Sequence, residues 1–261
     1  MYKTFITAPS FALSPAAAGL FGAALLTIFV LGAATGSARP LDTAASESSA
    51  IGNDSGEDES PVGYSCDPDP GGGMAPIICT GAIDPASSLM QFSLDWHHEA
   101  GPDERVIDAI TITDRLTARP IQIIKPVASR APMSLVANGF EFIDMNFDGY
   151  ADLRLVKTTT AGSNVYYSNW LWSPEQEIFV KDDALDALSS PSFDAEMQEV
   201  SARNRSSAAD YQTDFYAYDG PELVLTHRES DHYFSGTPCQ RTYFDRIGDD
   251  WKETGTGPCK D

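Results

Sequence analysis

The part of the chain best suited to chemistry is a short run of oxygen-bearing side chains between two apolar segments. Its oxygen donors, at positions 1, 3, 5 and 9 of a loop, are Asp144, Asn146, Asp148 and Asp152. Gly149 at position 6 permits a sharp backbone turn, and the carbonyl of Tyr150 falls at position 7. Hard oxygen ligands at alternate positions around a glycine turn are what Ca²⁺ requires, so the sequence predicts a calcium site.

This loop differs from an EF-hand at its end and in its flanks. Position 12 is Leu155, where an EF-hand has a bidentate Glu, and the flanking segments 140–142 and 153–155 alternate as strands do. We therefore expect a calcium loop in a β context, with a Kd on the order of 10⁻⁴ M or tighter. The ion would stabilise the turn by neutralising clustered carboxylates. The alternative is an Asx-rich turn that binds no ion.

Alternation of apolar and polar residues is the dominant pattern in the rest of the chain. Short runs rich in β-branched and aromatic residues, separated by Gly, Pro, Asn and Asp, predict strands. These runs are 90–96, 110–112, 121–123, 140–142, 153–155, 165–172, 178–180, 214–218, 223–225 and 243–247. One helix is predicted at 184–188, capped by Asp182 and Asp183 and ended by Pro191, and a weaker one around 195–200. The fold class is therefore mostly β: antiparallel meanders forming a sandwich or a partial propeller-like domain, with one or two short helices.

The N-terminal third has a different composition. Lys3 precedes an apolar run from Ala16 to Ala34 and a small-residue segment ending at Ala38, which predicts a signal peptide over 1–38. An uncleaved membrane anchor is the alternative. Residues 39–74 are Ser, Ala, Gly, Pro and acids, which favours a flexible acidic linker, so the calcium-binding β domain is predicted at 75–261. Both N-terminal alternatives place the domain outside the cytoplasm, in the periplasm or secreted.

The four cysteines agree with export. An even number of cysteines in an exported chain predicts disulfides, and four cysteines allow three pairings. Their grouping favours Cys66 with Cys79 and Cys239 with Cys259. Metal ligation is the competing hypothesis, but no C-x2-C spacing supports it.

Charge limits the classes of partner. The 261 residues contain 17 Lys and Arg against 38 Asp and Glu, a net charge of −21. Such an acidic chain repels phosphate backbones, which disfavours nucleic acid, and it favours cations and basic proteins. A membrane partner is expected only if the N-terminal segment stays uncleaved.

The region around the loop resembles a family of exported bacterial calcium-loop proteins. The resemblance is carried by the segment 142–153, the aromatic strand 166–172, the Ser173-Pro174 pair and Phe179. The family's best understood member is a periplasmic immunity protein against a peptidoglycan-hydrolase toxin delivered by type IV secretion. It is similar in fold to periplasmic inhibitors of invertebrate-type lysozyme. The resemblance implies an inhibitor of a basic cell-wall hydrolase or lysozyme that itself has no catalytic residues.

Two sites are candidates for partner binding. The lysozyme inhibitors use a Ser-Gly loop, which implies Ser235 and Gly236 here, although Thr237-Pro238 after them departs from that pattern. On the aromatic strand, Trp170 and Trp172 share one face and are expected in the core. Tyr167 and Asn169 lie on the other face, which is the second candidate for a binding surface.

The remaining chemical candidates are weaker. The four histidines, His97, His98, His227 and His232, lack the H-E-x-x-H spacing, and no G-x-S-x-G elbow occurs. Paired acids such as Asp182-Asp183 and Asp249-Asp250 are typical of a solvated acidic surface. The alternatives to an inhibitor are an exported hydrolase with a structural calcium and a surface-interaction protein of the integrin-repeat kind.

Overall fold

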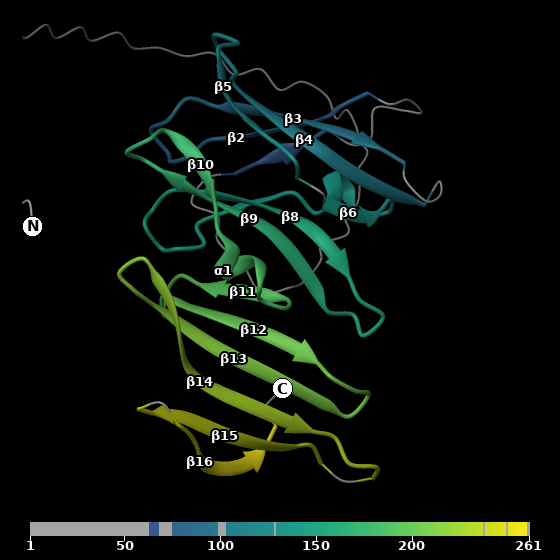
Figure 1. The fold of residues 1–261 in the computed structure, drawn as a ribbon, viewed down its shortest axis with the longest axis vertical. Helices are drawn as coiled ribbons and strands as arrows, with labels where there is room; N and C mark the ends of the chain where they lie inside the picture. Colours follow the sequence, from purple (N-terminus) through teal and green to yellow (C-terminus); the bar gives the residue numbers. More distant parts are fainter. Residues whose placement is uncertain are drawn as a thin grey trace, which may run out of the picture. The chain divides into compact units, whose positions relative to one another are not determined.

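Three antiparallel sheets make up the described part of the chain, with one short helix and one 3₁₀ turn (Figure 1). The computed structural model describes residues 63–67, 75–98, 103–127, 129–236, 238–248 and 250–259. The mostly β fold predicted from the alternation is confirmed. The predicted signal peptide, 1–38, and nearly all of the predicted linker lie outside the described residues. No helix within the described ranges has the length and apolar character needed to cross a bilayer.

The first sheet has the strand order β1-β2-β3-β4-β5, and β6 also pairs with β4. The bounds are β1 (Ser65–Cys66), β2 (Ile77–Gly81), β3 (Met90–His97), β4 (Glu104–Asp114), β5 (Pro120–Ile124) and β6 (Ser129–Pro132). Strand β1 lies within the range 39–74 predicted as a linker. Cys66 faces Cys79 in the register of β1 and β2 and forms a disulfide with it. This bond and the pairing explain why an otherwise polar segment joins the sheet.

The second sheet has the order β10-β9-β8-β7 and packs against the first. Its strands are β7 (Glu141–Ile143), β8 (Asp152–Thr159), β9 (Val165–Ser173) and β10 (Ile178–Lys181), and the 3₁₀ turn η1 (Val136–Asn138) precedes them. Alternate side chains of both sheets interdigitate in a first core around Phe92, Phe142 and Phe179. The Gln122 side chain donates to the Phe179 carbonyl and accepts from its amide, both at 2.8 Å. These bonds join the edges of the two sheets, so this part is the predicted sandwich.

A short helix, α1 (Asp183–Asp186), follows the second sheet. Its predicted cap is confirmed, because Asp182 Oδ1 accepts a hydrogen bond from Leu185 N at 2.7 Å. The second helix predicted around 195–200 is wrong. Residues 195–198 form a tight turn between two strands, where Phe193 pairs with Val200, and strand pairing overrides the local helix pattern.

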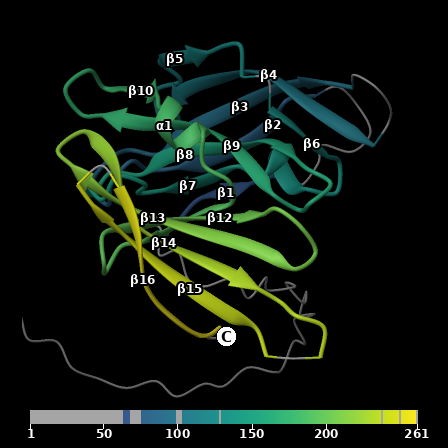
Figure 2. The same cartoon turned by 60° about the horizontal axis from the view of Figure 1, so that its bottom comes forward.

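The third sheet is a sequential meander, β11-β12-β13-β14-β15-β16 (Figure 1), and Figure 2 shows its strands β12 to β16 from a second direction. Its strands are β11 (Pro191–Asp194), β12 (Glu199–Arg205), β13 (Asp210–Asp219), β14 (Glu222–His232), β15 (Gln240–Ile247) and β16 (Asp250–Pro258). A second core joins its first strands to α1 and to the loop after β7; its buried members are Ile143, Met145, Leu185, Leu188, Phe193, Val200 and Ala202. The second sheet therefore has apolar neighbours on both faces.

Candidate metal centre

The predicted calcium loop connects the hairpin strands β7 and β8. Ile143 at the end of β7 pairs with Asp152 at the start of β8, which fixes both ends of the loop. Within it, Met145 is fully buried in the second core, and Phe147 packs against that core. Because the apolar side chains at alternate positions anchor the loop, the polar side chains between them are left to face one another: Asp144, Asn146 and Asp148.

Hydrogen bonds hold these polar side chains together. The two carboxylate oxygens of Asp144 accept from the amides of Asp148 at 3.1 Å and Gly149 at 2.8 Å. Asp148 in turn accepts from the Tyr150 amide and from Asn146 Nδ2, both at 2.9 Å. Gly149 has a φ of +88°, and a Cβ there would meet no atom, so the backbone conformation, not space, requires glycine. The loop thus gathers the side-chain oxygens that the sequence singled out.

Asp152 is the buried member of this set, with 0% of its surface exposed. Its Oδ2 accepts from the amide of Met145 at 2.8 Å, and its Oδ1 accepts from the amide of Trp172 at 2.7 Å. The carboxylate therefore ties the start of the loop to β9. Each carboxylate oxygen has a further lone pair, so Asp152 is able to support the fold and contribute to an oxygen site.

Acidic groups are concentrated in the loop, and their charges affect one another. Burial raises the pKa of Asp144, hydrogen bonding from Gly149 opposes this, and the charge of Asp148 raises the pKa further. Burial raises the pKa of Asp152 well above its ordinary value, and the charges of Asp148 and Asp144 add to the effect. No Lys or Arg of the described residues forms an ion pair with any of the three. A divalent cation with hard oxygen preference fits this donor set in both charge and chemistry.

One residue near the loop escapes sequence reasoning. Tyr218, from β13, packs edge-on against Phe147 with 6.2 Å between ring centroids. Burial raises the pKa of Tyr218, and so do the charges of Asp182 at the helix cap and of the three loop carboxylates. The hydroxyl therefore lies near the same acidic groups. Only the pairing of distant strands brings it there, and no spacing in the sequence signals it.

Asn169, predicted with Tyr167 as a partner surface, does not lie at the surface, and the role of Tyr167 stays a prediction. Asn169 is fully buried, and its amide nitrogens donate to Asp186 Oδ1, from the backbone at 2.8 Å and from the side chain at 3.2 Å. Tyr167 is half-buried on the same face. The reason is that this face of the second sheet is covered, like the opposite face. There Trp170 and Trp172 lie in the first core, as predicted.

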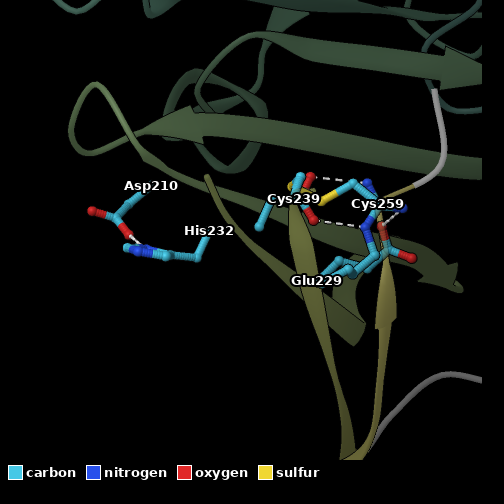
Figure 3. Close-up of a disulfide and its surroundings, with 7 residues drawn as sticks. Asp210, Glu229, His232, Cys239 and Cys259 are labelled. Atoms are coloured by element: carbon cyan, nitrogen blue, oxygen red, sulfur yellow. Dashed lines mark hydrogen bonds and ion pairs between the residues drawn. A yellow bond between two sulfur atoms is a disulfide. The ribbon is translucent and has the colours of Figure 1, made fainter. Parts of the chain in front are cut away.

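The predicted bond between Cys239 and Cys259 is also present in the structure. The Cys259 amide donates to the Cys239 carbonyl at 3.1 Å beside it (Figure 3). The carboxylate of Asp231 lies close to both sulfurs, but Arg241 Nε and Nη2 donate to it at 2.6 and 2.9 Å. Because both sulfurs are in a disulfide and the carboxylate is in an ion pair, Asp231, Cys239 and Cys259 have a structural role. The two disulfides are consistent with an extracytoplasmic location.

Ser235 and Gly236 lie in the connection between β14 and β15. Two aromatic residues before them are exposed, Tyr233 by 44% and Phe234 by 48%. The Tyr233 amide donates to the Ala209 carbonyl at 2.8 Å, which fixes one end of this connection. The disulfide described above fixes the other end. We refer to residues 233–236 as the aromatic loop.

The histidines do not converge on one site. His97 Nδ1 lies 2.7 Å from Asp108 in the first sheet. His232 Nδ1 lies 2.5 Å from Asp210 Oδ1 in the third sheet (Figure 3), and Ser207 Oγ donates to Asp210 Oδ2 at 2.6 Å. The carboxylate stands between the serine and the histidine, whereas an activated serine needs the base beside its hydroxyl. This arrangement matches a surface hydrogen-bond chain.

The comparisons with known proteins identify the fold. No family model matches the chain, and no curated protein matches its sequence. One solved structure is similar, that of a Xanthomonas type IV secretion system related protein, with a TM-score of 0.55 and 16% sequence identity. The similarity covers 74% of this chain and 99% of that chain. The chain therefore shares the fold of a protein related to type IV secretion and carries additional residues beyond it.

Proposed function

We propose that this chain is an exported, calcium-stabilised binding protein that inhibits a basic cell-wall hydrolase, in the manner of an immunity protein. The observation that carries the proposal is the similarity to the Xanthomonas protein, which extends over 99% of that protein's chain. The sequence resemblance around the calcium loop suggests the same kind of partner. Inhibition needs a surface that occupies the enzyme's cleft, so we assign no catalytic residue.

The charge of the chain supports a basic partner. A net charge of −21 attracts a cationic enzyme over a distance and speeds the encounter at low ionic strength. Hydrolases that act on an anionic wall polymer tend to be basic, which makes the two charges complementary. The association rate should then fall as salt is added.

In this proposal Ca²⁺ serves stability. Asp144, Asn146, Asp148 and Asp152 supply side-chain oxygens, and Tyr150 supplies its backbone carbonyl. The bound ion supplies the positive charge that offsets the repulsion among the carboxylates. The loop residues themselves position the β7–β8 hairpin against both cores.

We assign partner recognition to the aromatic loop, which includes the Ser-Gly pair. Tyr233 and Phe234 expose large side chains on a connection that a disulfide and a backbone hydrogen bond restrain. Aromatic side chains on a restrained loop lose little conformational freedom on binding, so they are suited to anchoring a partner.

The test is inhibition of wall lysis. The purified protein is mixed with each of a panel of basic lysozymes, and the turbidity of a peptidoglycan suspension is followed. We expect stoichiometric inhibition of at least one enzyme, and none from an unrelated protein of similar net charge. Clearing of the suspension by the protein alone would support the hydrolase alternative, and absence of both effects and of any complex would refute the proposal.

Two variants locate the binding surface. The double variant Tyr233→Ala/Phe234→Ala should weaken inhibition at least about thirtyfold, the loss expected for central aromatic anchors. Leu116→Ala is the matched control, since Leu116 is 89% exposed on a turn of the first sheet and should leave inhibition unchanged. Equal inhibition by both variants would remove the aromatic loop from the proposal.

A further inference from the structure

Tyr218 stands where the third sheet meets the calcium loop. Its ring belongs to the second core, together with the loop residues Met145 and Phe147. Its ring packs edge-on against that of Phe147, with 6.2 Å between the centroids, so the side chain lies against the loop. Tyr218 therefore links β13 directly to the loop.

The hydroxyl of Tyr218 is buried and has no hydrogen-bond partner among the described residues. Buried tyrosine hydroxyls normally find a partner, since an unpaired one loses its bonds to water without replacement. Around it are acidic groups from two elements: Asp182 at the start of α1, and Asp144, Asp148 and Asp152 of the loop. A buried hydroxyl without a protein partner, close to a cluster of carboxylates, is suited to bind a ligand that those carboxylates hold.

We propose that the Tyr218 hydroxyl is part of the oxygen shell around the bound calcium ion, and that it couples ion binding to the third sheet. The inference rests on the proposed calcium site and adds to it a residue from a distant strand. It makes Tyr218 a positioning residue: its hydroxyl gains a partner when the ion binds, and β13 is held against the loop. Groups that support a metal's ligand shell in this way typically change metal affinity by at least tenfold when they are removed.

The test compares Tyr218→Phe with the unchanged protein by calcium titration calorimetry and by thermal unfolding in calcium and in chelator. Phenylalanine keeps the ring and its contact with Phe147. We expect calcium affinity to fall by about tenfold. In chelator, the variant should unfold at the same temperature as the unchanged protein or at a higher one, because no protein hydrogen bond is lost. A purely structural role would instead lower the unfolding temperature equally in both conditions.

Tyr216→Phe is the matched control. Tyr216 lies two residues away on the same strand and packs against the same core, but the charged groups near it are Asp214 and Arg228. Its substitution should leave calcium affinity unchanged. If the unchanged protein binds calcium and Tyr218→Phe binds it equally well, the role of Tyr218 is refuted and the calcium site stands. If the unchanged protein binds none, both proposals are refuted.

Hydrogen exchange provides a readout that needs no variant. Adding calcium to the full chain should slow amide exchange in β13 around Tyr218, as well as in the loop itself. Slower exchange in the loop with no change in β13 would overturn the coupling while leaving the calcium site in place.

Discussion

Replacing Asp148 with Asn separates two effects of its carboxylate on stability: repulsion of the neighbouring carboxylates and binding of the proposed calcium ion. Asp148 is exposed, and its charge raises the pKa of both Asp144 and Asp152. Asparagine keeps one oxygen to accept from the Tyr150 amide, which preserves that bond of the turn, and gives up the bond that Asp148 Oδ2 accepts from Asn146 Nδ2. The variant therefore removes a like charge from the loop without calcium and removes a carboxylate ligand with calcium. The free energy of unfolding should change in opposite directions in the two conditions.

The magnitude follows from linkage. With a Kd of about 10⁻⁴ M, calcium at about one hundred times Kd stabilises the folded chain by about 2.7 kcal/mol. If losing one charged ligand weakens binding about thirtyfold, about 0.9 kcal/mol of this remains, so about 1.8 kcal/mol is lost. For a domain of this size that corresponds to an unfolding temperature lower by about 4 to 7 °C. In chelator, relief of repulsion at an exposed site should raise stability by no more than about 0.5 kcal/mol.

Thermal unfolding with calcium and with excess chelator measures both effects. The matched control is Asp194→Asn, which replaces an acid that accepts a turn hydrogen bond from Met197 outside the loop. It should shift the unfolding temperature equally in both conditions. A loss of stability by Asp148→Asn that is the same with and without calcium would refute the metal site, since a ligand stabilises only the state that binds it.

Three further outcomes are expected. Glu141→Gln should lower the free energy of unfolding by about 2 to 3 kcal/mol in urea titrations, because the guanidinium of the buried Arg154 loses its partner carboxylate. In excess chelator, lowering the pH from about 7 to about 5 should raise the unfolding temperature, since burial lifts the pKa of Asp144 and Asp152 above the unfolded value of about 3.9. The acids whose pKa is lowered in the folded chain reduce stability only when the pH falls below the unfolded value of about 3.9. A lower unfolding temperature at pH of about 5 would contradict the raised pKa of Asp144 and Asp152. Gly149→Ala should cost about 1 to 2 kcal/mol from its positive φ alone, and unchanged stability would show that the turn relaxes.

The strands and the spacing of the loop donors are predictable because each depends on residues that are close together in the sequence. Alternation needs only neighbouring residues, and the loop donors Asp144 to Asp152 lie within nine positions of one another. The cap of α1 is local as well, with Asp182 bonding three residues ahead. Local patterns fail where two structures compete for one segment. Residues 195–198 have a helix-like composition, but a strand on each side forces a turn.

The buried environment of Asn169 is not local. Its position on a strand predicts which face it occupies, but whether water or protein covers that face depends on a sheet formed later in the chain. Because α1 and the third sheet cover it, a polar side chain expected at a surface binds Asp186 inside the protein. Tyr218 escapes prediction for the same reason. Its relation to the loop depends on how the third sheet packs.

The architecture also predicts how far an effect of the proposed calcium ion would extend. The loop contacts all three sheets: the Ala151 amide donates to the Ile83 carbonyl of the β2–β3 connection at 2.7 Å, Asp152 bonds to β9, and Phe147 meets Tyr218 of β13. Tyr218 lies at one end of the β13–β14 hairpin, and the aromatic loop follows the opposite end, about 25 to 30 Å along the strands.

At that separation the proposed ion would support the proposed recognition surface through the stiffness of the sheet and would make no contact with the partner. Removing calcium at a temperature where the chain stays folded should therefore change the affinity for an inhibited lysozyme by no more than about twofold, the coupling typical of distant sites. The binding titration is run in calcium and in chelator at equal ionic strength, so that screening of the charged partner is the same in both. A loss of affinity of more than about tenfold in chelator would place the ion at the interface, and recognition would then belong to the calcium loop instead of the aromatic loop.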